Sequence, residues 1–318
     1  MKSSVFIGVD ASQAVLDAAL HGQDQRIQIE NTVSAIRRWV RALPPSCRIG
    51  VESTGKLHCL LVREAIAAGH TVYVLNARDL SHYARALGRR SKTDRLDAKL
   101  IARYLAHEYS NLHPYQLPTE LQTKLDELIR RRHQTVVSRE AHRQSFAQMT
   151  CKVRTVVRLM RAFDALIADI DAQLQALIHQ DPALATHASY LRTMVGFGPL
   201  LSVAAAHAIT RHPFKNADAF IAYIGYDPRV RDSGQLRGRR FLSKRGPAEL
   251  RRLLFTAAMS ASRTKLWRPF YERYRARGFS TTATLVIIAR KLARIAFSIV
   301  RHGVPFQPER IQSACLTP

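Results

Sequence analysis

Four acidic residues stand where their carboxylates could share a metal ion. Asp10 ends a short apolar run in the phrase IGVDAS, and Glu52 ends a second run in the phrase IGVEST. Acids at matching ends of neighbouring strands would lie together beyond one edge of a sheet. Asp94 and Asp97 are three residues apart in SKTDRLDAKLIARYL, near the start of an expected helix, so they would share one face of that helix.

Clustered carboxylates suit phosphodiester chemistry. Phosphate esters hydrolyse extremely slowly without a catalyst, and enzymes that cleave them commonly hold one or two Mg²⁺ ions between carboxylates, where the charge on the attacking and leaving oxygens is stabilised. Each acid alone has an ordinary explanation, because acids are favoured in the first turn of a helix and often follow strands. Together the four predict a Mg²⁺ site and a catalytic centre made of Asp10, Glu52, Asp94 and Asp97.

A strongly basic stretch lies near the C-terminal end. Residues 237–252 contain one acid, Glu249, and seven basic residues: Arg237, Arg239, Arg240, Lys244, Arg245, Arg251 and Arg252. This density of positive charge would attract a phosphate backbone and make the binding salt-dependent. Three glycines and Pro247 predict a loop ahead of a helix that begins near Ala248, which would leave Ser243 accessible rather than packed.

Ser243 is a candidate nucleophile within this stretch. A serine hydroxyl is a poor nucleophile unless a base, a metal or nearby positive charge favours its alkoxide, and the surrounding cations supply the electrostatic part. From the residues alone two roles stay open, namely attack on a phosphodiester or a hydrogen bond to a DNA phosphate. Ser233 is a competing serine, which we expect to be structural or to contact DNA.

The elements that must position these residues divide the chain into three segments. At 318 residues the chain exceeds the usual domain length of about 100–200 residues. The apolar pattern of residues 1–118 predicts strands and helices in the order βββαβαβα, and that of residues 119–182 predicts a long helical linker. Residues 183–318 predict a mainly helical domain. The expected fold class is therefore an α/β domain joined by a helical linker to an all-α domain.

The linker has the pattern of a coiled coil in its second half. No proline or glycine lies between Pro118 and Pro182. Apolar residues from Met149 to Leu177 follow alternating four- and three-residue steps. The first half keeps this phase but places polar residues in the seam: Arg132, Thr135, Arg139 and His142. Either a turn makes a helical hairpin, or the basic stretch Arg130–Arg143 faces an anion.

Two further features belong to the C-terminal segment. Gly196 and Gly198 flank a phenylalanine between two apolar helical runs. A G-x-G between helices is similar to the turn of helix–hairpin–helix modules, where backbone N–H groups approach a phosphate, although an ordinary interhelical turn needs glycine as often. The last expected helix, Thr281–His302, has basic residues on one side and apolar residues on the other. We expect its apolar side to pack on the core.

The overall charge predicts a polyanionic partner. The formal net charge is +25, and in residues 183–318 lysine and arginine outnumber the acids by 23 to 6. Fold stability does not require such a charge, and self-repulsion makes it slightly unfavourable, so we expect a polyanionic partner.

Cysteine usage and hydropathy predict a cytoplasmic protein. Four dispersed cysteines suggest neither a zinc site nor disulfides: Cys47, Cys59, Cys151 and Cys315. The N-terminus turns polar too early for a signal peptide, and no run approaches the roughly 18 apolar residues of a membrane span.

Particular phrases carry a resemblance to a known family. The order βββαβαβα with D…E…DxxD resembles the RNase H-like fold of Holliday-junction resolvases, the RuvC-like fold. GVDASQAVLD, ESTGKLH and KTDRLDAKLIARYL, with GFGPLLSVAAAHAI and SGQLRGRRFLSKRGPAELRRLL, are similar to the DEDD transposases of the "one-ten" insertion-sequence family, which includes pilin-gene inversion recombinases. The similarity spans nearly the whole chain. Val195 and Pro247 depart from the family's usual proline and asparagine.

The resemblance implies a Mg²⁺-dependent DNA recombinase that moves an insertion element. In this family the four acids bind Mg²⁺, and the serine of the S-K-x-G motif, here Ser243, forms a covalent phosphoserine with DNA. It also implies an element-encoded guide RNA that pairs with donor and target DNA. Because recombination holds several strand ends at once, we expect a homodimer or homotetramer formed through the coiled coil, with acids of one subunit completing the site around Ser243 of another.

Two other functions stay open. A junction-resolving nuclease with the same N-terminal domain would hydrolyse DNA with metal-activated water, and Ser243→Ala would leave its cleavage intact. A non-enzymatic nucleic-acid-binding protein would use the acids only as caps of helices and strands, and Asp10→Ala would then leave its activity unchanged.

Overall fold

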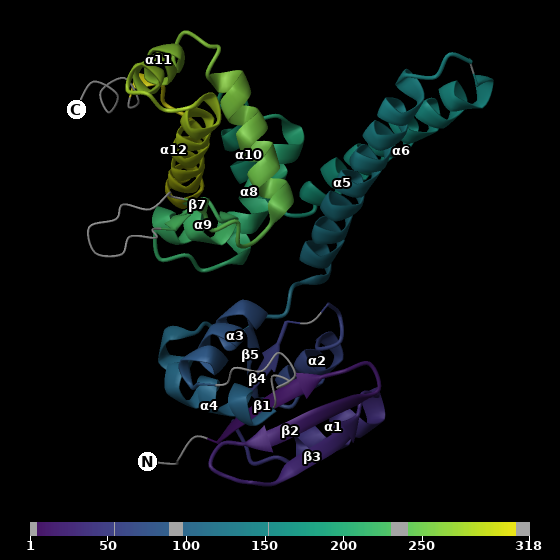
Figure 1. Ribbon diagram of the computed structural model, residues 1–318, viewed down its shortest axis with the longest axis vertical. Coiled ribbons are helices and arrows are strands. Elements are labelled where there is room, and N and C mark those ends of the chain that lie inside the picture. The colour runs from purple at the N-terminus through teal and green to yellow at the C-terminus, as the bar shows by residue number, and fades with distance from the viewer. Residues whose placement is uncertain (1–4, 54, 89–97, 152, 230–240, 310–318) are drawn as a thin grey trace. The chain divides into compact units, whose positions relative to one another are not determined.

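The computed structural model describes residues 5–53, 55–88, 98–151, 153–229 and 241–309 (Figure 1). The chain divides into two compact units, an N-terminal unit, Met1–Leu117, and a C-terminal unit, Pro118–Pro318. Each unit has its own buried hydrophobic residues.

The N-terminal unit contains a five-stranded mixed sheet. Its strands are β1 (Phe6–Ala11), β2 (Val15–Leu20), β3 (Arg26–Glu30), β4 (Arg48–Glu52) and β5 (Thr71–Leu75). Their spatial order is β3-β2-β1-β4-β5, in which β1, β2 and β3 are antiparallel neighbours and β1, β4 and β5 are parallel neighbours. The α/β character predicted for this segment is confirmed.

Helices cover both faces of this sheet. They are α1 (Val33–Ala42), α2 (Cys59–Ala67), α3 (Ala77–Ala86) and α4 (Ala98–Glu108), followed by the 3-10 turn Tyr109–Asn111. On one face α1 and α2 share a core with alternate strand residues such as Ile7 and Val9. On the other face α3 and α4 pack against Tyr73 and Leu75. The sequence predicted one helix after β5, whereas the described residues of this unit contain two, α3 and α4.

Polar caps fix where several helices begin. The Thr32 hydroxyl accepts a hydrogen bond from the N–H of Ala35 at the start of α1, and the Asn76 side chain accepts one from Arg78 at the start of α3. These bonds satisfy N–H groups that have no partner within the helix.

Gly8 determines how closely α4 approaches β1. A Cβ atom at Gly8 would lie 2.1 Å from the carbonyl oxygen of Ala98 and 2.2 Å from the amide nitrogen of Ala102. Only glycine fits here, because both neighbours are backbone atoms. The first turn of α4 therefore lies directly on β1.

The C-terminal unit begins with an antiparallel helical hairpin of α5 (Glu120–Ala147) and α6 (Arg154–Ile178) (Figure 1). Arg132 pairs with Asp171 and Arg139 pairs with Asp164, at 2.5 and 2.7 Å. Of the two alternatives for the linker, the structure has the hairpin. Two of the polar seam positions of α5 are thus matched by acids on α6, which the sequence analysis did not assign as partners.

Along most of α6 the residues of the predicted seam are buried or half-buried, whereas the first two are exposed. Met149 and Val153 precede α6 and are exposed, because the chain turns between the two helices. The other seam positions are buried or half-buried: Val156, Met160, Phe163, Ile167, Ile170, Leu174 and Leu177.

The remaining helices of this unit surround one core. They are α7 (Pro182–Arg192), α8 (Pro199–Arg211), α9 (Ala217–Ile224), α10 (Ala248–Ala261), α11 (Arg268–Ala276) and α12 (Thr281–His302), with a small antiparallel ladder of β6 (Pro228–Arg229) and β7 (Phe241–Leu242). As expected, the apolar side of α12 is buried, including Ile288 and Leu292. Leu125 of α5 belongs to the same core, so the base of the hairpin packs with these helices. No helix in the described part of the chain has the length and apolar character needed to cross a membrane.

Candidate active site

The first candidate site is an acidic pair at the carboxyl ends of two parallel strands of the N-terminal unit. Val9 of β1 is the register partner of Val51 of β4, so the next residues, Asp10 and Glu52, are neighbours across the strands. Val9 and Val51 face the core under α1 and α2. Because side chains alternate along a strand, Asp10 and Glu52 point to the opposite face, which is covered by α4.

The environment of this pair disfavours two negative charges. Glu52 is only 8 % exposed. Burial first, and then the negative charge of Asp10, raise the pKa of the Glu52 carboxyl above its usual range. A divalent cation would relieve both effects, because it replaces lost hydration and neutralises the repulsion. Asp10 and Glu52 therefore fit an oxygen-ligand metal site.

A third acid lies beside this pair but is engaged elsewhere. Asp17 of β2 is the register partner of Asp10, and its carboxylate accepts a hydrogen bond of 3.1 Å from the Gln28 side chain. Sequence patterns did not single it out. Among the residues that the structure describes, no three His, Cys, Asp or Glu side chains gather as metal ligands would.

The other two predicted acids, Asp94 and Asp97, lie outside the described residues. Helix α4 begins at Ala98, the residue after Asp97 in the sequence. Because Ala98 packs over Gly8, the described chain resumes on the face of the sheet that carries Asp10 and Glu52.

A second candidate site surrounds Ser243, in the C-terminal unit. Its hydroxyl donates a hydrogen bond to the Asp227 carboxylate, and its backbone N–H donates to the Asp227 carbonyl at 2.9 Å. The expectation of an accessible side chain was wrong, since Ser243 is only 5 % exposed. A phosphate can reach this hydroxyl only after neighbouring groups move. Asp227 is a site residue that the sequence analysis missed.

The backbone around Ser243 is held in an unusual conformation. Lys244 has a φ of +52°, in the left-handed region, and its N–H donates to the Gly225 carbonyl. Gly225 and Gly246 also have positive φ, and a Cβ on either would meet a backbone oxygen at 2.1 Å or less. The segment that carries Ser243 is therefore fitted against the end of α9. Helix α10 begins at Ala248, as predicted.

The half-buried Arg251 holds this segment in place through hydrogen bonds to backbone carbonyls. One of its guanidinium nitrogens donates to the carbonyls of Ile224, Arg245 and Gly246 at 2.8, 2.9 and 3.2 Å. Its own carbonyl accepts a hydrogen bond from the Tyr226 hydroxyl at 2.7 Å. Of the predicted phosphate contacts, Arg251 is thus engaged with the protein backbone.

The other predicted DNA contacts differ in their surroundings. Lys244 is exposed and Arg245 is half-buried, whereas Arg252 makes two hydrogen bonds to Glu249, at 2.8 and 2.7 Å. Four predicted residues lie outside the described part of the chain: Ser233, Arg237, Arg239 and Arg240.

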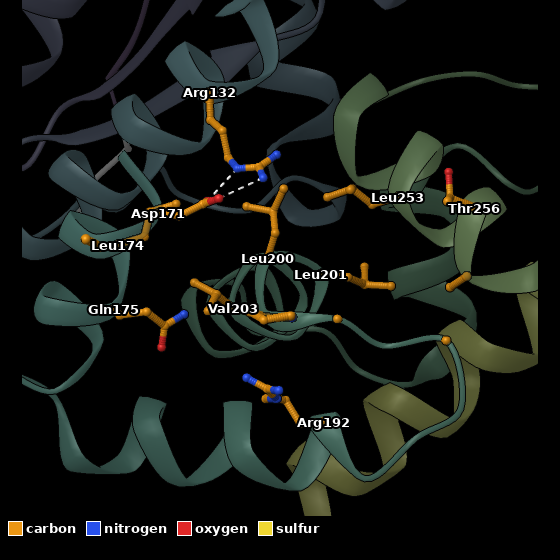
Figure 2. A pocket seen from close by; sticks show the side chains of 15 residues that line it. Arg132, Asp171, Leu174, Gln175, Arg192, Leu200, Leu201, Val203, Leu253 and Thr256 are labelled. Atoms are coloured by element: carbon orange, nitrogen blue, oxygen red, sulfur yellow. Dashed lines mark hydrogen bonds and ion pairs between the residues drawn. The ribbon is translucent and has the colours of Figure 1, made fainter. Parts of the chain in front are cut away.

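The predicted G-x-G turn joins α7 to α8 and lines a cavity of about 680 Å³. A Cβ at Gly196 would lie 2.5 Å from the Ala257 carbonyl oxygen, so Gly196 permits close packing on α10. Gly198 is exposed at the start of α8. Figure 2 shows the cavity, with the Arg132–Asp171 ion pair on one wall and Arg192 on another. The turn has a packing role, whether or not its amides meet a phosphate.

Comparison with known proteins identifies the family. Residues 7–150 match the family model described as DEDD transposase of IS110 type, and residues 188–275 match the transposase IS116/IS110/IS902 family. The pilin gene-inverting proteins of Moraxella bovis and Moraxella lacunata are each 29% identical to this chain, over 96% of its length and 98% of theirs. A probable family 20 transposase of Pseudomonas aeruginosa is 23% identical, over 95% and 98% of the two lengths. The chain belongs to the IS110 family of transposases, enzymes that cut and rejoin DNA.

Proposed function

We propose that this chain is a Mg²⁺-dependent recombinase that moves an insertion element by attacking DNA with Ser243. The observation that carries the proposal is the acidic pair of Asp10 and Glu52 at adjacent strand ends, where burial and like charge favour a bound cation. The Moraxella relatives are named for inverting a pilin gene, which requires DNA to be cut and rejoined. Rejoining favours a recombinase over a hydrolytic resolvase.

The N-terminal unit is, in this proposal, an RNase H-like or RuvC-like domain. Support comes from the strand order β3-β2-β1-β4-β5, with three antiparallel strands followed by two strands parallel to β1. In such a domain the acids lie at the ends of the central strands, and β1 and β4 carry Asp10 and Glu52 there.

Asp10 and Glu52 would hold Mg²⁺ together with Asp94 and Asp97. Asp97 is bonded to Ala98, which packs two residues from Asp10 along β1, and consecutive Cα atoms are about 3.8 Å apart. The position of Ala98 over Gly8 supports including Asp97 in the proposed metal site. A bound divalent cation supplies stabilisation of charge on the phosphoryl oxygens.

Ser243 and its basic neighbours would engage the DNA. Lys244 is exposed directly beside Ser243, and the nearby sequence adds Arg237, Arg239 and Arg240. These cations attract a phosphate backbone, and backbone contacts position DNA without identifying its sequence. We include Arg245, Gly196 and Gly198 in this surface, and we assign Arg251 and Arg252 to holding it in place.

A guide RNA and a homo-oligomer complete the proposal. The net charge of +25 is suited to more than one nucleic-acid ligand, and strand exchange requires several DNA ends to be held together. The acids of one subunit would then serve the Ser243 of another.

The test is a covalent-adduct assay. Purified protein is incubated with Mg²⁺, the circular junction of the element, target DNA and any co-purifying RNA, and is then denatured and separated by size. The recombinase forms a protein–DNA adduct that survives denaturation and is lost in Ser243→Ala and Glu52→Gln. Cleavage that persists in Ser243→Ala without an adduct would instead identify a hydrolytic resolvase.

A further inference from the structure

Asp227 and Ser243 are held opposite each other by the two-stranded sheet of β6 and β7. Asp227 precedes β6 and Ser243 follows β7, and Pro228 is the register partner of Leu242. The ladder continues one step further, because the Ser243 N–H donates to the Asp227 carbonyl. Backbone pairing alone therefore places the two side chains together.

The side-chain hydrogen bond between them has a definite direction. An ionised carboxylate can only accept, so the Ser243 hydroxyl donates its proton to Asp227 Oδ1. The backbone N–H of Arg245 approaches the same hydroxyl oxygen at 3.4 Å. With the proton directed at Asp227, a lone pair of the Ser243 oxygen is available for bonding to phosphorus.

This side-chain bond is not needed to close the loop. The segment is already fixed by the Ser243 and Lys244 backbone bonds and by the three bonds of Arg251. A half-buried carboxylate such as Asp227, hydrogen-bonded to a hydroxyl, has a chemical use where that hydroxyl must lose a proton. Among the described residues, the charge of Asp227 acts on Arg290 of α12. Lys244 and Arg245 follow Ser243 directly in the loop.

Arg290 supports this assignment from the neighbouring helix. Its Nε atom is buried and has no hydrogen-bond partner among the described residues. Burial lowers the pKa of Arg290, while the charges of Asp218 and Asp227 raise it. The Arg290 guanidinium therefore interacts electrostatically with Asp227, and its Nε–H has no hydrogen-bond partner among the described residues. A cation with such a donor is suited to binding a phosphate.

We propose that Asp227 is the catalytic base of Ser243, accepting its hydroxyl proton during attack on DNA. This inference rests on the proposed nucleophilic role of Ser243. In cleavage, the Ser243 oxygen bonds to phosphorus as its proton passes to Asp227, and the bond from phosphorus to the leaving sugar oxygen breaks with its electron pair. The sugar oxygen takes a proton from solvent. In rejoining, a sugar hydroxyl bonds to the phosphorus of the phosphoserine and loses its proton to solvent. The bond from phosphorus to the Ser243 oxygen breaks with its electron pair, and Asp227 returns a proton to that oxygen.

The test compares Asp227→Asn with the wild-type protein by the rate of adduct formation. General bases typically contribute about 10²–10⁴-fold, so we expect a loss of that order with unchanged DNA affinity. Because hydroxide must replace the missing base, the logarithm of the residual rate should rise steadily with pH where the wild-type rate has levelled off. A merely structural bond would lower the rate without changing this pH profile.

Asp218→Asn is the matched control, since Asp218 lies on α9 and pairs with Arg294 instead of Ser243. It should form adduct at the wild-type rate. If Asp227→Asn folds poorly, Asp227→Ala with added formate replaces it, because a small carboxylate can enter the vacated space and restore the rate. Rescue by formate supports the base.

Two outcomes would overturn the inference, and they differ from each other. If the wild-type protein forms the adduct and Asp227→Asn forms it at the same rate, Asp227 is not the catalytic base, and Ser243 remains the nucleophile. Strand exchange without any adduct, also in Ser243→Ala, would remove the proposed function and the base with it.

Discussion

Replacing Glu52 with glutamine should stabilise the metal-free protein and abolish its stabilisation by Mg²⁺. Glu52 is buried beside Asp10 on the neighbouring strand, and adjacent strands are about 4.8 Å apart. At that separation two unit charges repel by about 0.9 kcal/mol in water and about 3.5 kcal/mol at an effective dielectric constant of 20. Glutamine has nearly the same shape without the charge, so a gain of roughly 1–3 kcal/mol is expected.

The gain in stability from Glu52→Gln should increase as pH rises. Because the pKa of Glu52 is raised in the folded state, the unfolded chain loses this proton at lower pH than the folded protein does. The destabilisation is therefore absent at low pH, develops as pH rises from the usual carboxyl range to the raised folded pKa, and is constant above it. The advantage of Glu52→Gln over the metal-free wild type should be larger at neutral pH than in acid.

Thermal unfolding with EDTA or with Mg²⁺ measures both effects. Glu64→Gln is the matched control, because Glu64 is a buried carboxylate of the same unit that pairs with Arg37 and Arg63, which lower its pKa. That substitution should lower the melting temperature and leave the response to Mg²⁺ intact. The reasoning is refuted if both variants are destabilised, or if Mg²⁺ stabilises Glu52→Gln as much as wild type.

Three further predictions concern packing, DNA binding and pH. Gly8→Ala should destabilise the protein by about 1–3 kcal/mol or more in urea unfolding, since its Cβ meets backbone, whereas Gly50→Ala meets only side-chain ends at 3.2 Å or more and should cost less. Lys244→Ala should reduce the salt dependence of DNA binding by about one counterion, while Arg251→Ala should lower the melting temperature and leave that slope nearly unchanged. Burial lowers the pKa of His212 to about 4, so folding stability should fall as pH drops from about 6.5 towards 4, and His212→Gln should flatten that slope.

Much of the N-terminal unit could be predicted because its signals are local. Short apolar runs ending in Asp10 and Glu52 fix both the strands and the positions of the acids along them. The parallel register of β1 and β4 then makes the two acids neighbours. Helix α3 was not predicted, and Leu80 is its one buried residue.

The surroundings of Ser243 could not be predicted because they depend on contacts between distant residues. The strands that align Asp227 with Ser243 have two residues each, too short for any alternating pattern. The basic character of the loop indicated exposure, whereas Arg251 turns inward to the backbone of Ile224. Burial of Ser243 follows from that tertiary packing and leaves no trace in the local sequence.

The partners of the polar seam residues in the hairpin of α5 and α6 also could not be predicted from the local sequence. Arg132 and Arg139 were recognised as polar residues in an apolar seam, but their acidic partners lie on the next helix, Asp171 39 residues after Arg132. Polar seam positions can be satisfied across an antiparallel pair as well as by an external anion. The turn between α5 and α6 determines that the arginines of α5 meet acids of α6 and not an external anion.

The central claim is that Ser243 becomes covalently joined to DNA. Its most direct test is mass spectrometry of the adduct after protease and nuclease digestion, using the complete protein with Mg²⁺, junction and target DNA. The account predicts a nucleotide bonded to the Ser243 oxygen, absent from Ser243→Ala. Strand exchange with the nucleotide on another residue, or with no modified peptide at all, would contradict it.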